Sequence, residues 1–226
     1  MKLKMFKISL CTLIILLLLL IYLRDKRSFY KNIKDIDKPS KIDVLVNKNN
    51  RLDKFYRPRD LVKIDENFSY KEKYLRQKAC HFFEKMSKDA KEEGLNIIAV
   101  STYRSYFYQR ELYNNYVKTM GVKKALLASA KPGHSEHQTG LAVDVMGSNG
   151  DYNKFENSKE FKWMKNNAYK YGFILRYPKG KEDLTGYDYE PWHYRYVGVD
   201  VAKQIHEEDI TFDEYYAYYI ENKGTK

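Results

Sequence analysis

Ser135-Glu-His-Gln-Thr-Gly-Leu-Ala-Val-Asp144 predicts a loop that tightens at Gly140 and then enters a short apolar strand. Its apolar end continues to Met146 and predicts a short strand, Leu141–Met146, in which successive side chains point to opposite faces. Asp144 would then share one face with Ala142 and Met146. An unpaired charge on so apolar a strand is costly to bury. Asp144 therefore requires a cation or several hydrogen-bond donors beside it.

A histidine and a second polar cluster offer partners for this aspartate. His137 lies seven residues before Asp144, and because an odd offset in one strand would point the two side chains apart, His137 must come from the preceding loop. The second cluster is Glu190-Pro191-Trp192-His193. Each of these residues alone is more often structural, so the prediction depends on the combination. Two histidines and an aspartate, with a glutamate as base, are typical of a catalytic zinc site that keeps a position open for water.

Glu190 is expected to act on a proton and not to bind the ion. It lies three residues before His193, so the two side chains would point in opposite directions in a flat strand. Pro191 disturbs that geometry and favours an extended conformation for Glu190 at the strand entrance. Its carboxylate would then serve as general base and afterwards as acid to the leaving amine. A fourth metal ligand or a solvent-facing carboxylate are the alternatives.

The two clusters together form a motif. Ser135-x-His137-x2-Gly140-x-Ala142-x-Asp144, followed by Glu190-x-Trp192-His193, resembles the pattern of VanY-type zinc D-alanyl-D-alanine carboxypeptidases. The resemblance covers roughly residues 42–205. It implies the Hedgehog/DD-peptidase fold and the trimming of peptidoglycan stem peptides in a bacterial cell wall.

The resemblance also implies roles for individual residues. One Zn²⁺ ion would be held by His137, Asp144 and His193, with Glu190 as the catalytic base. Arg104, Gln109 and Ser135 match family positions that contact the substrate. Arg104 follows a predicted strand and could clamp a carboxylate or stabilise an oxyanion. Without the resemblance, an arginine at this place is more often a surface charge.

The remaining chain predicts an α+β domain with a small, mainly antiparallel sheet flanked by helices, because helices and strands interleave without a regular alternating unit. The expected strands are 96–102, 141–146, 173–177 and 191–197. The expected helices are residues 70–93, a helix that carries Gln109 and ends near residue 120, residues 125–130, a helix from Ser158 to Gly172, and the helices after residue 197. The long polar loop 178–189 is a candidate rim or lid over the cleft.

Composition limits the partners. The chain has 226 residues, a formal net charge of +11 and a pI near 9.3. Such a charge favours anionic surroundings. We expect a membrane face or cell wall and no nucleic acid, because no nucleic-acid-binding motif appears. Cys11 and Cys80 allow neither a disulfide framework nor a cysteine zinc site.

The N-terminus predicts a membrane anchor. Residues 8–23 are apolar, and with Met5 and Phe6 the run reaches the lower bound of about 17 residues for a helix that spans a bilayer. No small-residue cleavage site follows, which favours an uncleaved signal anchor. The expected organisation is a cytoplasmic stub and anchor at 1–23, a tether at 24–41 and a catalytic domain at 42–226. The resemblance places that domain outside a single-pass bacterial membrane, and we expect a monomer.

The leading hypothesis is therefore a membrane-anchored zinc carboxypeptidase that removes the C-terminal D-amino acid of stem peptides. On the same zinc site, an endopeptidase cutting within the stem and an L,D-carboxypeptidase are alternatives. A wall-binding module that kept zinc but lost hydrolysis is a further alternative. The intact Glu190 argues against it, because a pure binder has no use for a base there. A nucleic-acid binder exploiting the positive charge is disfavoured and would show a steep salt dependence.

Overall fold

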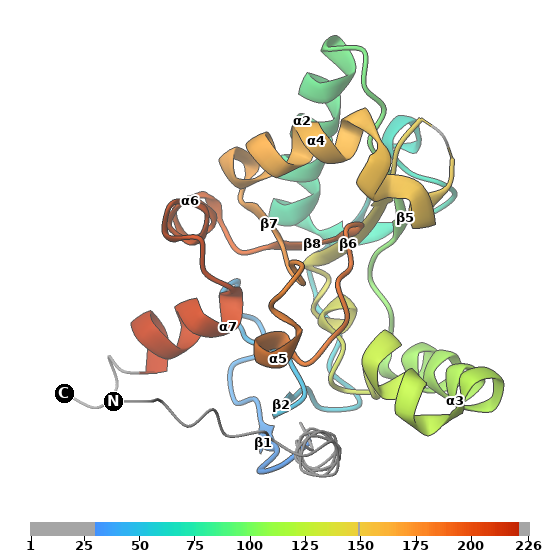
Figure 1. Cartoon of the computed structure of the whole chain (residues 1–226), viewed down its shortest axis with the longest axis vertical. Helices are drawn as coiled ribbons and strands as arrows, with labels where there is room; N and C mark the ends of the chain where they lie inside the picture. Colours follow the sequence, from blue (N-terminus) through green and yellow to red (C-terminus); the bar gives the residue numbers. More distant parts are fainter. Residues whose placement is uncertain (1–29, 149, 222–226) are drawn as a thin grey trace, which may run out of the picture.

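An antiparallel sheet of four strands lies at the centre of the computed structural model, which describes residues 30–148 and 150–221 (Figure 1). The strand order is β5-β6-β8-β7, and every neighbouring pair is antiparallel. This confirms the predicted α+β class with an antiparallel sheet. The strands are β5 (Ile98–Ser101), β6 (Ala142–Met146), β7 (Phe173–Leu175) and β8 (His193–Tyr196).

The central strand β6 has two different faces, as its alternating pattern predicts. Val143 and Val145 belong to the main hydrophobic core, where they are fully buried. Asp144 and Met146 line a cavity on the opposite face. The strand is entered through Gly140, whose φ is +66° and whose Cβ, if it had one, would come within 2.8 Å of a side-chain carbon of Leu61. Glycine is therefore required at this tight entrance.

Helices cover the core face of the sheet. The amphipathic α2 (Gln77–Glu92) directs Phe83 and Met86 into the same core as Val143 and Phe173. α4 (Lys159–Asn167), which is capped by Ser158 as predicted, meets the C-terminal end of α2, where Trp163 Nε1 donates to Glu93 Oε1 at 2.8 Å. The helix predicted from residue 70 begins only at Gln77, because β4 (Tyr74–Arg76) pairs first with β3 (Leu61–Lys63).

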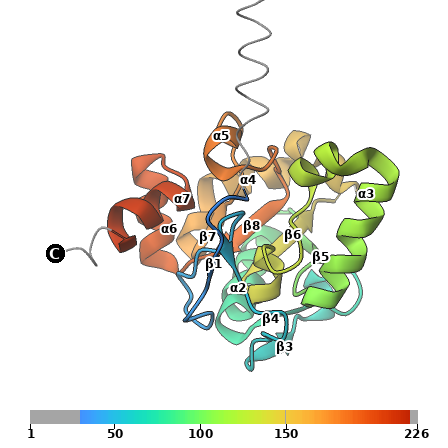
Figure 2. The same ribbon diagram turned by 90° about the horizontal axis from the view of Figure 1, so that it is seen from below.

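The long helix α3 (Tyr106–Ala128) stands apart from α2 and α4 (Figures 1 and 2). The Ser105 side chain caps it by accepting from the backbone N–H of Tyr108. Two helices were predicted here, one ending near residue 120 and one at 125–130. The structure has one element with a break at Gly121, whose φ of 79° is not helical. Helical stretches lie on both sides of this break, so the predicted division near residue 120 is confirmed, although the second stretch ends at Ala128 and not at residue 130.

The segment before residue 42 lies against the domain from Tyr30 onward. β1 (Lys34–Asp35) pairs in parallel with β2 (Asn50–Arg51), and Ile36 packs on the main core. The sequence assigned residues 24–41 to a tether, so the described part of that tether packs as part of the fold. The predicted anchor and residues 24–29 lie outside the described residues. Among the helices that the structure does describe, none is long and apolar enough to cross a membrane.

The C-terminal helices build a second, smaller core around Ile174, Val197 and Phe212. Between the two cores and α3, Lys48 is buried and donates to the carbonyl oxygens of Leu126 and Gly186. It thereby ties the end of α3 to the loop 178–189. The remaining helices are η1 (Glu66–Phe68), η2 (Glu136–Thr139), η3 (Tyr152–Asn157), η4 (Ala168–Tyr171), α5 (Glu182–Thr185), α6 (Val199–Glu208), α7 (Phe212–Tyr215) and η5 (Tyr216–Glu221).

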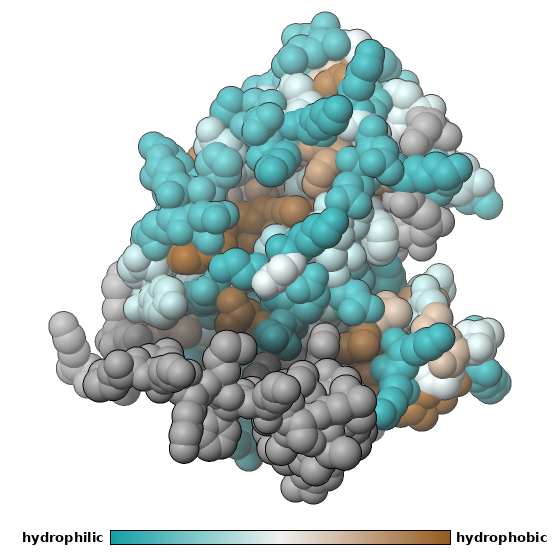
Figure 3. Space-filling model, in the orientation of Figure 1, coloured by the Kyte–Doolittle hydropathy of each residue, from teal (hydrophilic) through white to brown (hydrophobic). Residues whose placement is uncertain are grey.

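The face of the molecule drawn in Figure 3 is largely covered by hydrophilic side chains, with hydrophobic ones gathered in smaller patches. This polar surface agrees with a chain in which 31% of the residues are charged and whose mean hydropathy is −0.69. The apolar residues are concentrated in the two cores beneath it.

Candidate active site

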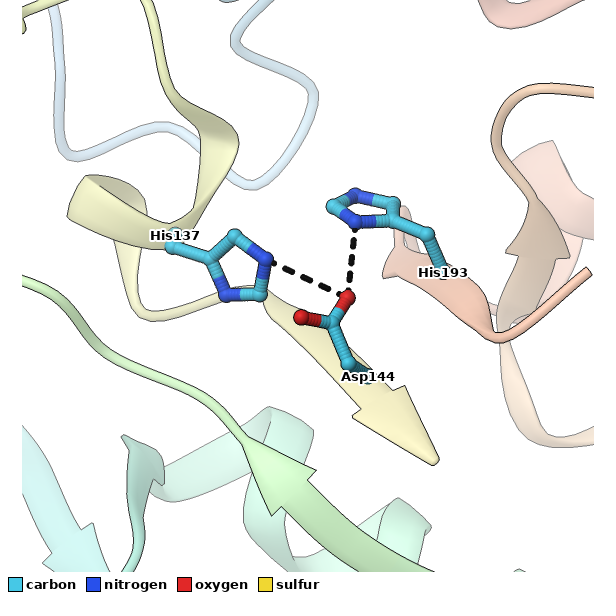
Figure 4. A group of neighbouring side chains, drawn as sticks. All are labelled: His137, Asp144 and His193. Carbon is cyan, nitrogen blue, oxygen red and sulfur yellow. Dashed lines mark hydrogen bonds and ion pairs between the residues drawn. The ribbon is translucent and has the colours of Figure 1, made fainter. Parts of the chain in front are cut away.

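Three buried side chains converge beside the central strands (Figure 4). His137 comes from η2, Asp144 from β6 and His193 from the first position of β8. Asp144 Oδ1 lies 3.3 Å from His137 Nε2 and 2.9 Å from His193 Nδ1. One donor atom from each residue lies within 4.8 Å of the other two, so the group could hold a metal ion.

The backbone fixes this convergence. β6 and β8 pair in a register that sets Asp144 directly opposite His193. His137 reaches the group from the turn before β6, as its odd offset from Asp144 predicts. Its Nδ1 lies 2.7 Å from the carbonyl oxygen of Thr102. Because that oxygen only accepts, Nδ1 carries the proton and Nε2 turns a lone pair toward Asp144.

Asp144 is held as a carboxylate and divides its two oxygens. Oδ1 faces the histidines, while Oδ2 accepts from Arg104 Nη2 at 2.7 Å. Burial alone would raise the pKa of Asp144, but His137, His193 and Arg104 outweigh burial and hold this pKa well below its usual range. For His137, burial lowers the pKa to about 4, so this imidazole is neutral and able to bind a metal.

Glu190 stands next to the group but outside it. Its Oε2 lies 3.5 Å from His193 Nδ1, and burial raises the pKa of its carboxyl to about 7. The strand predicted from Pro191 begins instead at His193. Residues 190–193 form a turn in which the N–H of His193 donates to the carbonyl oxygen of Glu190 at 3.2 Å. This turn, and not an extended approach, brings the two side chains to one side of the backbone.

The other expected site residues line the same cavity, whose volume is about 590 Å³. Arg104 donates from Nε to Ser101 Oγ at 2.9 Å and from Nη1 to Gln109 Oε1 at 3.3 Å. The Gln109 amide nitrogen donates in turn to the carbonyl oxygen of Ala130 at 2.8 Å. Ser135 is buried in the wall. All seven residues expected from the sequence therefore lie around one cavity.

Residues 72–199, which include both clusters, match the family described as VanY: D-alanyl-D-alanine carboxypeptidase. The chain belongs to this family. It is 47% identical over 201 residues to the putative carboxypeptidase YodJ of Bacillus subtilis (strain 168), covering 83% of this chain and 74% of the relative.

Two solved structures place the fold in the same family. The LdcB LD-carboxypeptidase superposes with a TM-score of 0.78 at 46% identity, covering 84% of this chain and 95% of that one. A mutant of the vancomycin-resistance D,D-pentapeptidase VanY from a VanB-type cassette, in complex with Zn(II), superposes with a TM-score of 0.66 at 30% identity, covering 77% and 98%.

The donor set of this VanY-family chain fits zinc. Two imidazoles and one carboxylate are ligands that zinc prefers, whereas magnesium or calcium would require oxygen ligands throughout. One of the imidazoles is neutral, and Asp144 is ionised with Oδ1 turned toward both. The expected cofactor, one zinc ion, is therefore consistent with the chemistry of the residues that converge here.

One residue of the site was not predicted. Glu136, beside His137 in the sequence, is buried and accepts from Arg176 Nε at 2.8 Å and Arg195 Nη1 at 2.9 Å. The sequence held a signal for it, since Arg176 follows an apolar strand and Arg195 stands between two tyrosines in another. A buried arginine requires a carboxylate. This rule predicts a carboxylate beside the two arginines, but it does not identify which glutamate or aspartate supplies it.

Proposed function

We propose that this protein is a zinc-dependent carboxypeptidase that removes the C-terminal D-amino acid from peptidoglycan stem peptides. The observation that carries the proposal is the position of Glu190, a proton acceptor 3.5 Å from His193 in the cavity that also holds the His137–Asp144–His193 group. Bound by these three residues, zinc would supply a Lewis acid that polarises the scissile carbonyl and lowers the pKa of water.

Glu190 acts as the base and then as the acid. It takes a proton from the attacking water and returns it to the leaving amine. A general acid–base group works best when its pKa lies near the working pH. Burial raises the pKa of Glu190 to about 7, so the carboxyl can both accept and release a proton near neutrality.

Arg104 recognises the free carboxylate at the end of the substrate. Its guanidinium lines the cavity with the side chain only 18% exposed, so a charge-assisted bond made there is weakly screened by solvent. Gln109 holds Nη1 of this guanidinium, and Ser135 contributes a hydroxyl to the same wall. We propose that these three residues bind the terminal carboxylate, a group that an endopeptidase does not meet at this distance from the scissile bond.

A comparison of free-acid and amidated peptides tests this recognition. We expect rapid release of D-alanine from a stem peptide ending in D-Ala-D-Ala and no release from its C-terminal amide, measured by mass spectrometry. Arg104→Ala should lose about 10- to 100-fold on the acid, because a hydrogen bond to a charged group contributes about 1.5–3 kcal/mol. It should also discriminate less between acid and amide.

Arg104→Lys is the matched variant for that comparison. It keeps a positive charge beside Asp144 but lacks the planar fork that grips a carboxylate. We expect it to retain zinc and still to lose selectivity for the acid. Equal cleavage of acid and amide by the unmodified protein would overturn the carboxypeptidase proposal in favour of the endopeptidase.

A second candidate function is that of an L,D-carboxypeptidase, which cleaves the bond between an L-residue and a terminal D-residue. It is favoured by the 46% identity to the LdcB LD-carboxypeptidase, against 30% to the D,D-pentapeptidase VanY. The same release assay decides between the two bonds when it is run on both kinds of stem peptide. A D,D-enzyme shortens stems that end in two D-residues, whereas an L,D-enzyme acts on stems in which one terminal D-residue follows an L-residue.

We further propose that the protein is anchored in a bacterial membrane through residues 5–23, with the catalytic domain outside. The support is the length of the apolar run, the basic residues before it and the lack of a cleavage site. We expect the cell-associated protein to keep its N-terminus at Met1 or its neighbour. Recovery from the medium of a form that starts near residue 25 would indicate a cleaved signal instead.

A further inference from the structure

The two histidines of the metal group differ in what holds their second nitrogen. In His137 that nitrogen is Nδ1, and the carbonyl oxygen of Thr102 holds it at 2.7 Å. In His193 the second nitrogen is Nε2, which is buried and lies 3.6 Å from Glu136 Oε2. Within residues 30–148 and 150–221, neither Nε2 of His193 nor Oε2 of Glu136 has a hydrogen-bond partner. A buried donor and a buried acceptor thus face each other, each without another partner.

Glu136 cannot turn away from His193. Its other oxygen, Oε1, accepts from both Arg176 and Arg195, and all three side chains are fully buried. The arginines are themselves fixed: Arg176 Nη1 lies 2.6 Å from Asp213 Oδ2, and Arg195 Nη2 donates to the carbonyl oxygen of Val44 at 2.8 Å. With Oε1 held by two donors, Oε2 is left aimed at the imidazole.

We propose that Glu136 is the positioning residue of His193: its Oε2 accepts a hydrogen bond from Nε2–H, which leaves the lone pair that would bind a metal on Nδ1, the nitrogen 2.9 Å from Asp144 Oδ1. This rests on the proposed function only in taking His137, Asp144 and His193 as zinc ligands. A carboxylate behind a metal-binding imidazole fixes its tautomer and its orientation and makes it a better ligand. Glu136 would do for His193 what the carbonyl oxygen of Thr102 does for His137.

Glu136→Gln tests the proposal with a change of one atom. Arg176 and Arg195 both donate, so they would hold the amide oxygen of the new side chain and direct its NH₂ group toward His193. A donor facing Nε2 favours the tautomer with the proton on Nδ1, the nitrogen that must bind the metal. We expect the zinc dissociation constant, measured on the full chain by competition with a chelator, to rise about 10- to 100-fold.

Asp213→Asn is the matched control. It removes one negative charge from the same group of buried ions, since Asp213 pairs with Arg176, but Arg176 separates it from His193. We expect its zinc dissociation constant to stay within about threefold of that of the unmodified protein. This should hold even if Asp213→Asn lowers the melting temperature of the zinc-free protein as much as Glu136→Gln does. Unchanged zinc affinity in Glu136→Gln, or equal loss in both variants, would overturn the proposal.

A spectrum of the unmodified protein decides the question even if Glu136→Gln does not fold. In the zinc-loaded chain with ¹⁵N-labelled histidine, we expect the metal on Nδ1 of His193 and a slowly exchanging proton on its Nε2. Metal on Nε2 would overturn the role of Glu136. Failure of the unmodified protein to bind one zinc ion would instead remove the metal site itself, and with it the proposed function.

Discussion

Replacing Glu190 by glutamine is expected to lower turnover about 10²- to 10⁴-fold while one zinc ion per chain stays bound. Glutamine has nearly the same shape, so the turn at residues 190–193 and the position of His193 should persist. What is lost is the proton acceptor. The three donor atoms that converge on one point come from His137, Asp144 and His193, so removing the Glu190 carboxylate leaves that set complete.

The measurement is the initial rate of D-amino acid release together with the zinc content of the same sample. Asp188→Asn is a suitable control, because it neutralises an exposed carboxylate two residues earlier on the same loop, outside the cavity lining. We expect the control to keep its rate. Near-normal turnover by Glu190→Gln would show that another group carries the proton.

Removing one of the three side chains that would bind zinc should abolish both zinc binding and activity. In Asp144→Ala, both imidazoles lose the carboxylate between them and Arg104 loses its partner, so some stability is lost as well. His137→Ala removes a metal ligand without removing a partner of Arg104, because the described residues show no bond between the His137 side chain and Arg104. We expect less than one tenth of the zinc content of the unmodified protein in either variant.

Thermal unfolding with and without zinc provides the check. A ligand that binds only the folded state stabilises it by a free energy that grows with the logarithm of the ratio of ligand concentration to dissociation constant, and it therefore raises the melting temperature. Micromolar zinc should therefore stabilise the chelator-stripped unmodified protein and leave Asp144→Ala and His137→Ala unchanged. If either variant still held zinc tightly and was stabilised by it, the donor set would be wrong.

The features that could be predicted from the sequence are those set by short stretches of chain. Alternation along residues 141–146 placed Asp144 on the face opposite Val143 and Val145, and the structure confirms it. The offset of seven residues placed His137 outside the strand, and η2 holds it there. In both cases the geometry of a few consecutive residues decides the outcome.

The features that were missed depend on contacts between distant parts of the chain. Glu136 has a defined position because Arg176 and Arg195, 40 and 59 residues later, fold over it. Residues 30–41 appeared to be a tether because their attachment is to Asn50, Tyr56 and the main core, none of which a local pattern reveals. The pairing of Arg104 with Asp144 is of the same kind.

The register between β6 and β8 also brings together members of the metal group that are far apart in the sequence. His137 and Asp144 are seven residues apart in the sequence. His193 follows Asp144 by 49 residues, and the two lie together only where β8 pairs with β6. β7 precedes β8 in the chain yet pairs only with β8 among the described strands, so its place in the sheet also depends on β8. A nascent chain that has not reached residue 193 carries two of the three donors and a half-built sheet. A zinc site with all three ligands therefore requires that β8 has been made and has paired with β6.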